Sequence, residues 1–207
     1  VAMVNLTACY ANGTGISQDD AEAVKWHRKA AEAGSVDAMA GLGNCYANGV
    51  GVGRNESVAA TWYLRAAEAG HIAAMFHLGQ SYANGSGVKQ DDAEAANWYR
   101  QAAEGGVADA MYELGRCYDT GSGVELDFAE AVRWYRQATE KGHADAMYEL
   151  GVSHMCGAGV VEDSSEAVSW YRRAIDAGNA DAMLALGACY HAGTGVEQDY
   201  AEAVKWY

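Results

Sequence analysis

The stretch that decides the fold is Ala110–Asp145, AMYELGRCYDTGSGVELDFAEAVRWYRQATEKGHAD. Its beginning predicts a short helix, because apolar residues recur there at helical spacing, at Ala110, Met111, Leu114 and Tyr118. Gly115 lies on this apolar stripe and lets a second backbone approach closely. The segment Gly-Ser-Gly at 121–123 then predicts a turn, because glycine accepts a positive φ.

A second helix is expected directly after this turn. Asp127 and Glu130 form a D-x-x-E capping box, in which the first side chain accepts a backbone N–H of the first turn. The same box recurs at Asp19/Glu22, Asp91/Glu94, Asp163/Glu166 and Asp199/Glu202. This helix is expected to end at Gly142 as its C-cap and to bury Ala131, Trp134, Tyr135 and Ala138. Neither helix is long enough to be stable alone, so each helix-loop-helix unit needs a neighbour.

The same unit recurs along the whole chain with a period of 36 residues and no insertions. All six tryptophans follow this period, at Trp26, Trp62, Trp98, Trp134, Trp170 and Trp206, and we expect them to be structural core residues. The chain holds 25 Gly, most of them in four such columns, and no Pro. We therefore predict an all-α fold, an α/α solenoid that forms a right-handed superhelix of helix-loop-helix repeats.

The predicted array is a single one over residues 1–207, with units 2–37, 38–73, 74–109, 110–145, 146–181 and 182–207. The last unit is incomplete and the first residue is Val1, so we expect a fragment of a longer chain. The residues are 50% hydrophobic and 20% charged, which indicates a folded protein and not a disordered one. No apolar run approaches the ~18 residues of a membrane span, so direct membrane insertion is not expected.

The pattern A-x-x-x-L-G-x-x-Y-x-x-G-x-G-V, followed by D-x-x-x-A, W-Y and A-x-x-G, resembles the Sel-1-like repeat, a relative of the tetratricopeptide repeat. The resemblance covers essentially all of the chain. It implies an adaptor or scaffold for protein complexes and not a catalyst. A few positions depart from the pattern: Asn55 and Val58 replace one capping box and predict a weaker helix start, and Thr7, His27 and His154 replace a Gly and two Tyr.

The formal charge of −14 has a largely structural explanation. Besides the capping boxes, Asp37, Asp109, Asp145 and Asp181 are expected to cap the first helices of their units. A basic protein partner is the alternative interpretation of the acidic charge. Nucleic acid is not expected as a partner, because phosphate binding needs a basic stripe that this chain lacks.

Cysteine usage favours a reducing, cytoplasmic setting. Four of the five thiols share one column, Cys9, Cys45, Cys117 and Cys189, in which successive repeats lie too far apart for a disulfide. The location stays open, because relatives of this kind also occur in the periplasm, in secreted form and in the endoplasmic-reticulum lumen.

Catalysis and cofactor binding are not expected. The Gly-x-Gly loops resemble phosphate cradles, but acidic caps occupy the N–H groups that a phosphate would need. One metal-site alternative combines His154, Cys156, Cys189 and His191, yet their spacing matches no standard zinc motif, and packing in the core is favoured. No arrangement of Ser, His, Asp or Cys recurs with catalytic logic. We therefore expect no enzyme activity, no metal and no cofactor.

Protein binding has better support, because some positions of the first helix vary while their neighbours stay fixed. In tetratricopeptide-like superhelices the first helices line the concave face, so these positions are candidates for a partner-binding groove. The candidates are Asn44, Phe76, His77, Gln80, Tyr112, Glu113, Arg116, Tyr148 and Glu149. The alternative is that the three aromatic rings only pack between adjacent helices.

The expected function is that of a non-catalytic interaction module, an adaptor or scaffold that binds a segment of a partner protein. Two alternatives remain open. In the first alternative, the chain is a structural subunit built permanently into a large assembly. In the second, it is the repeat region of a larger enzyme or degradation complex whose catalytic part lies elsewhere.

Overall fold

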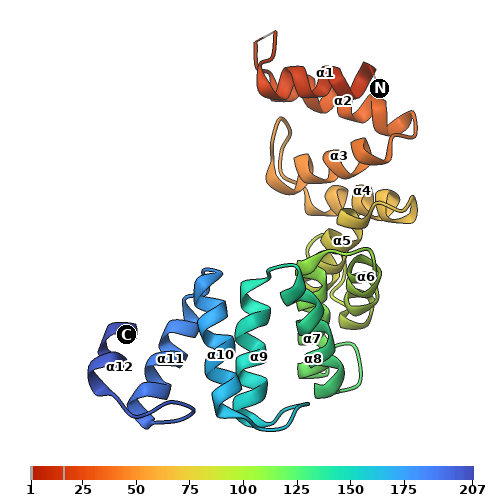
Figure 1. The fold of residues 1–207 in the computed structure, drawn as a ribbon. Helices are drawn as coiled ribbons and strands as arrows, with labels where there is room; N and C mark the ends of the chain where they lie inside the picture. The colour runs from red at the N-terminus through yellow and green to blue at the C-terminus, as the bar shows by residue number, and fades with distance from the viewer. Residues whose placement is uncertain (1, 16) are drawn as a thin grey trace. The chain divides into compact units, whose positions relative to one another are not determined.

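The structure, a computed structural model, describes the backbone of residues 2–15 and 17–207 and the side chains of residues 6, 7, 9–15 and 17–207. This part of the chain holds twelve helices and no strand (Figure 1). They are α1 (Ala2–Asn12), α2 (Asp20–Glu32), α3 (Val36–Asn48), α4 (Glu56–Glu68), α5 (Ile72–Asn84), α6 (Asp92–Glu104), α7 (Ala108–Thr120), α8 (Phe128–Glu140), α9 (Ala144–Cys156), α10 (Ser164–Asp176), α11 (Asp181–Ala192) and α12 (Tyr200–Trp206). The predicted all-α solenoid of helix-loop-helix repeats is confirmed. Among the described helices, none is long and apolar enough to cross a membrane.

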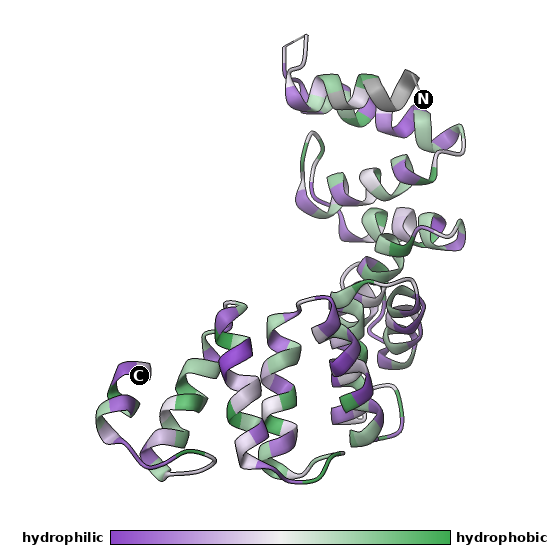
Figure 2. Cartoon of the chain, in the orientation of Figure 1, coloured by the Kyte–Doolittle hydropathy of each residue, from purple (hydrophilic) through white to green (hydrophobic). Residues whose placement is uncertain are grey.

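The chain forms two compact units, Val1–Gly105 with α1–α6 and Gly106–Tyr207 with α7–α12. Within each unit every helix packs against the next one along the chain. The odd-numbered helices are the first helices of their repeats and the even-numbered helices are the second. Figure 2 shows hydrophobic and hydrophilic residues alternating along the helices, as expected where one stripe of each helix is buried.

Two columns of side chains fill the core of each unit. The first helices contribute Leu42, Leu78, Leu114, Leu150 and Leu186, none of which is more than 1% exposed. The second helices contribute the buried rings of Tyr63, Tyr99, Tyr135 and Tyr171. The glycine that follows each leucine makes room for the ring: a Cβ at Gly115 would lie 2.6 Å from Cε1 of Tyr135. The close approach predicted for Gly115 includes backbone, because the added Cβ would lie 3.3 Å from the carbonyl oxygen of Ala131, but the nearest atoms belong to the aromatic ring.

The tryptophans border this core instead of forming its centre. Trp134 is buried, whereas Trp26, Trp62, Trp98, Trp170 and Trp206 are half-buried. Three of the indole rings lie beneath a basic side chain one turn further along the helix, such as Arg173 at 4.0 Å from the ring centroid of Trp170. One face of these rings thus meets a cation at the surface, which stabilises a half-exposed position.

The second helices begin as the sequence predicts. Each has an N-cap side chain that accepts a backbone N–H of the first turn, at Asp19, Asn55, Asp91, Asp127, Asp163 and Asp199. Asn55 fills this role as the aspartates do, with its Oδ1 3.1 Å from the N of Val58, so the change from the capping box leaves the N-cap hydrogen bond in place. The expectation that Gly142 is the C-cap of the second helix is wrong by one residue: the C-cap of α8 is Lys141, and Gly142 follows it with a φ of 84°.

The first helices begin differently from the prediction. Asp37, Asp109, Asp145 and Asp181 do not cap them but lie inside their first turns. Where a side chain caps a first helix, it is the ring of His71 or His143, or the amide of Asn179, which lies just ahead of α11. These capping side chains also reach back to the preceding repeat, where Asn179 donates to Asp145 at 2.6 Å and His143 Nε2 lies 3.4 Å from Asp109. Three of the four expected caps, Asp37, Asp109 and Asp145, therefore act as links between repeats.

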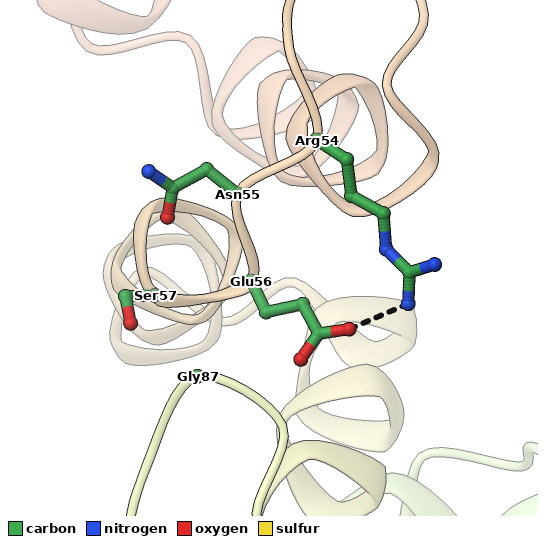
Figure 3. Close-up of a pocket in the computed structure, with 5 residues that line it drawn as sticks. All are labelled: Arg54, Asn55, Glu56, Ser57 and Gly87. Atoms are coloured by element: carbon green, nitrogen blue, oxygen red, sulfur yellow. Dashed lines mark hydrogen bonds and ion pairs between the residues drawn. The ribbon is translucent and has the colours of Figure 1, made fainter.

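The loop between the two helices of one repeat lies against the start of the second helix of the preceding repeat. Gly87 shows this contact most clearly: its φ is +77°, and a Cβ there would lie 2.2 Å from the carbonyl carbon of Glu56. Figure 3 shows Gly87 facing the first turn of α4, beside a hollow of about 410 Å³ lined by Arg54, Asn55, Glu56 and Ser57. Only glycine fits this position, because it needs both the positive φ and the absence of a side chain.

Candidate functional site

The first unit has a polar hollow between α3, α4 and α5. Its volume is about 360 Å³, and it is lined by Asn44, Ala47, Asn48, Tyr63, His77, Gln80, Ser81, Asn84 and Ser86. Three of the predicted binding residues, Asn44, His77 and Gln80, therefore come together here. The hollow is rich in side-chain amides and hydroxyls, which can both donate and accept hydrogen bonds.

Hydrogen bonds and ring contacts order the lining of this hollow. The Tyr63 hydroxyl donates to Oδ1 of Asn44 at 2.7 Å, and its ring lies 5.1 Å from the ring of His77. His77 Nδ1 lies 3.3 Å from Oε1 of Gln80. Burial raises the pKa of Tyr63 to about 12, so its hydroxyl stays neutral and keeps its proton at physiological pH.

The three predicted aromatic anchors each lie partly against the core. Phe76 packs on Tyr99 with ring centroids 5.9 Å apart, and the rings of Tyr112 and Tyr148 lie 6.0 and 5.8 Å from Tyr135 and Tyr171 respectively. All three anchors remain half-buried. One side of each ring thus packs between helices, as the alternative interpretation supposes, while part of the ring stays accessible.

In the second unit three of the predicted residues are charged, Glu113 and Arg116 on α7 and Glu149 on α9. Arg116 pairs with Glu113 at 3.2 Å and lies 5.8 Å from the ring centroid of Tyr112. Glu149 is half-buried, and burial together with the charge of Asp119 raises the pKa of its carboxyl, against the opposing effect of Arg116. A carboxylate in this position is destabilised unless a cation comes close.

Two residues of this unit with shifted pKa values do not follow from the sequence reasoning. Asp119 is half-buried, and burial raises the pKa of its carboxyl, while the charge of Arg116 lowers it. Tyr135 is only 1% exposed, and burial raises the pKa of its hydroxyl far above the usual range. The signal for Asp119 was present in the sequence, because the other repeats have Ala11, Ala47, Ala83, Met155 and His191 in this column.

The residues of the metal-site alternative do not converge. Among the described residues no group of three or more His, Cys, Asp and Glu side chains is placed to hold a metal ion. Cys189 instead lines an apolar hollow of about 290 Å³ with Met155, Tyr171, Ala185, Ala188, Ala192 and Thr194. Burial raises the pKa of the Cys45 and Cys189 thiols, which makes them poor nucleophiles at neutral pH.

Six consecutive matches to the Sel1 repeat cover the chain, at residues 1–35, 36–71, 72–107, 108–143, 144–179 and 180–207. The chain belongs to the Sel1 repeat family. The matched repeats have the predicted period and begin one or two residues earlier than the predicted units. Sel1 repeats commonly serve in protein–protein interactions and are generally non-catalytic scaffolds. No curated protein matches the chain in sequence.

Solved structures of Sel1-repeat proteins resemble the chain over nearly its full length. One is c5321, a protective antigen of uropathogenic Escherichia coli strains that displays an SLR fold; it is 36% identical, with a TM-score of 0.93 over 99% of this chain. This chain spans only 44% of the length of that antigen. A Sel1 repeat protein from Oxalobacter formigenes is 33% identical, with a TM-score of 0.87, over 99% of this chain and 82% of its own.

A more distant similarity concerns the fold alone. Helicobacter pylori cysteine rich protein B is 23% identical and has a TM-score of 0.50, over 62% of this chain and 92% of its own.

Proposed function

We propose that the chain is a non-catalytic interaction module, which binds a segment of a partner protein along its first helices. The supporting observation is the correspondence between variation and exposure. On the first helices, the leucine column, which stays the same between repeats, is buried. The nine predicted binding residues come from columns that vary, and every one of them is half-buried or exposed.

The chemistry of these surfaces supports recognition of a polypeptide. In the first unit the hollow around Asn44 and Gln80 offers amide groups, which match the donors and acceptors of a peptide backbone. In the second unit Tyr112 and Tyr148 offer partly exposed rings beside charged groups. Aromatic anchors next to polar groups are typical of the residues that carry most of the energy in protein interfaces.

The test is affinity capture from the native cells with the intact parent protein, followed by mass spectrometry. The variant Tyr112→Ala/Arg116→Ala/Tyr148→Ala removes the predicted anchors of the second unit. A matched control, Arg133→Ala/Arg136→Ala, changes two exposed residues of the second helix α8. Circular dichroism establishes that each variant keeps its helix content.

The proposal predicts a partner that is captured by the wild type and by the α8 control but lost by the triple variant. The single variant Arg116→Glu, at an exposed position, is expected to weaken capture without touching the core. A partner retained by the folded triple variant and lost by the α8 control would contradict the proposal and favour a structural subunit that uses its second helices.

A further inference from the structure

The polar hollow between α3, α4 and α5 has no Asp, Glu, Lys or Arg in its lining. It is lined instead by side-chain amides, hydroxyls and the ring of His77, and the buried hydroxyl of Tyr63 stays neutral. An ion that entered this hollow would lose water without gaining a counter-charge, which is unfavourable. The lining therefore favours a neutral polar ligand over a phosphate, a carboxylate or a basic side chain.

Hydrogen bonds within the lining decide which atoms remain for a ligand. Oδ1 of Asn44 accepts the Tyr63 hydroxyl at 2.7 Å, so the Nδ2 group of Asn44 is left as a donor. Oε1 of Gln80 lies 3.3 Å from Nδ1 of His77, and since a carbonyl oxygen only accepts, Nδ1 carries the proton of the neutral ring. Nε2 of His77 is then an acceptor and Nε2 of Gln80 a donor, and neither has a partner in the described part of the chain.

The imidazole that provides this acceptor is held in place by its neighbours. Its ring centroid lies 5.1 Å from that of Tyr63 and 5.8 Å from that of Phe76. Oγ of Ser81 donates to the backbone carbonyl of His77 at 2.9 Å. Because these contacts exist before a ligand arrives, less conformational entropy is lost on binding than at a freely rotating side chain.

The combination of these groups occurs in one pair of repeats only. The column of Asn44 and Gln80 continues with Arg116, Val152 and Ala188, and the column of His77 continues with Glu113, Glu149 and Ala185. The other repeats fold without this set of donors and acceptors. The set is therefore not a requirement of the repeat fold, which supports a role in recognition.

We propose that Asn44, His77 and Gln80 bind the side-chain carboxamide of a glutamine in the partner segment. The carboxamide oxygen accepts from Nδ2 of Asn44 and Nε2 of Gln80, and the carboxamide NH₂ donates to Nε2 of His77. Glutamine fits because its two methylenes place this group inside the hollow of about 360 Å³ while its backbone stays at the rim. The assignment rests on the proposed function, since it names the chemical group that the first unit recognises.

The test uses a defined probe, the peptide acetyl-Gly-Ala-Gln-Ala-Gly-N-methylamide, whose only side-chain polar group is the carboxamide. One control peptide has glutamate in place of glutamine, which keeps the shape but adds a charge and removes the NH₂ donors. A second has γ-N,N-dimethylglutamine, which is neutral and keeps only the acceptor. Each peptide is titrated into the ¹⁵N-labelled 207-residue chain, and binding is followed by NMR of the histidine rings and the side-chain amides.

The free chain is expected to show His77 with its proton on Nδ1, with the signal assigned from His77→Phe. The glutamine peptide should shift the signals of His77 Nε2 and of the Asn44 and Gln80 amides. Both control peptides should bind more weakly by about three- to tenfold or more, because at least one hydrogen bond is lost.

Three variants and one control measure the contribution of each group. His77→Phe keeps an aromatic ring, Gln80→Met keeps an unbranched chain and Asn44→Ala removes an exposed amide; each should weaken binding of the glutamine peptide by about three- to tenfold. Asn97→Ala, which removes an exposed amide from the second helix α6, should leave binding unchanged. Circular dichroism shows whether each variant keeps its helix content.

The subsite is overturned if the glutamine peptide causes no shifts around the hollow, if the control peptides bind as well as it does, or if the three folded variants bind it as the wild type does. A free His77 with its proton on Nε2 would also contradict it. These outcomes are distinguishable from failure of the proposed function. A cellular partner that is lost by the Tyr112→Ala/Arg116→Ala/Tyr148→Ala variant but retained by Gln80→Met would uphold the interaction module and overturn only the glutamine subsite.

Discussion

The substitution Gly87→Ala is expected to destabilise the first unit by about 2–5 kcal/mol, for two reasons that act together. The backbone at this position has a φ of +77°, which costs a residue with a Cβ about 1–2 kcal/mol. The new Cβ would also lie 2.2 Å from the carbonyl carbon and oxygen of Glu56 and 2.6 Å from the N of Ser57. Rigid backbone at the start of α4 would have to move, which costs about 1–3 kcal/mol as in other overpacked sites.

Two further glycines separate these contributions. Gly70 has a φ of +88° and nothing within 4 Å of an added Cβ, so Gly70→Ala should show the backbone strain alone. Part of that strain is offset by about 0.4–1 kcal/mol from the lower entropy of the unfolded chain. Gly53 has neither a positive φ nor a close neighbour, so Gly53→Ala should be neutral or should stabilise by up to about 1 kcal/mol.

The measurement is the free energy of unfolding in urea, followed by tryptophan fluorescence and by circular dichroism for the wild type and the three variants. The expected order of stability is Gly53→Ala, then Gly70→Ala, then Gly87→Ala. A Gly87→Ala variant within about 0.5 kcal/mol of Gly70→Ala would show that the contact between the loop and α4 does not contribute to stability, and would refute the explanation given for this glycine column.

Three further predictions concern a cap, the core and a half-buried acid. Asp91→Ala should cost about 1 kcal/mol in urea unfolding, because its side chain accepts two backbone N–H groups of α6, whereas the exposed neighbour change Asp92→Ala should cost less than about 0.5 kcal/mol. Leu114→Ala should cost about 2–5 kcal/mol, because this side chain is 0% exposed, and Leu126→Ala, at 52% exposure, serves as its matched control. Glu149→Gln should raise the thermal unfolding temperature at pH 7, because burial raises the pKa of Glu149 and so disfavours its charged form in the folded state. The higher unfolding temperature of the variant should be lost as the pH falls from the raised pKa of Glu149 towards the ordinary value of 4.5, because the wild-type carboxyl becomes protonated over this range. A difference in unfolding temperature that stays constant with pH would contradict this explanation.

Only some of the candidate binding residues could be grouped from the sequence. The columns that vary identified Asn44, His77 and Gln80, and the structure places all three around one hollow. The same criterion would have found Asp119, whose column is otherwise alanine, methionine and histidine. Tyr135 could not have been found in this way, because its column is tyrosine in the neighbouring repeats and only its lack of a hydrogen-bond partner sets it apart.

The sequence by itself determined the repeat, the type of its helices and the caps of the second helices. These features depend on local chemistry: the spacing of apolar residues along one helix, the positive φ of glycine, and a side chain that accepts an N–H two or three residues away. The same local rule failed at Asp145, because its partner is Asn179, 34 residues further along the chain.

Only the tertiary structure decided which side chains of successive repeats meet. It brought Asn44 of α3, Tyr63 of α4 and His77 of α5 around one hollow, and it placed most of the tryptophans at the border of the core. Such contacts depend on how each helix is rotated against its neighbours, and a rotation that shifts a side chain from the core to the surface leaves the 36-residue pattern unchanged.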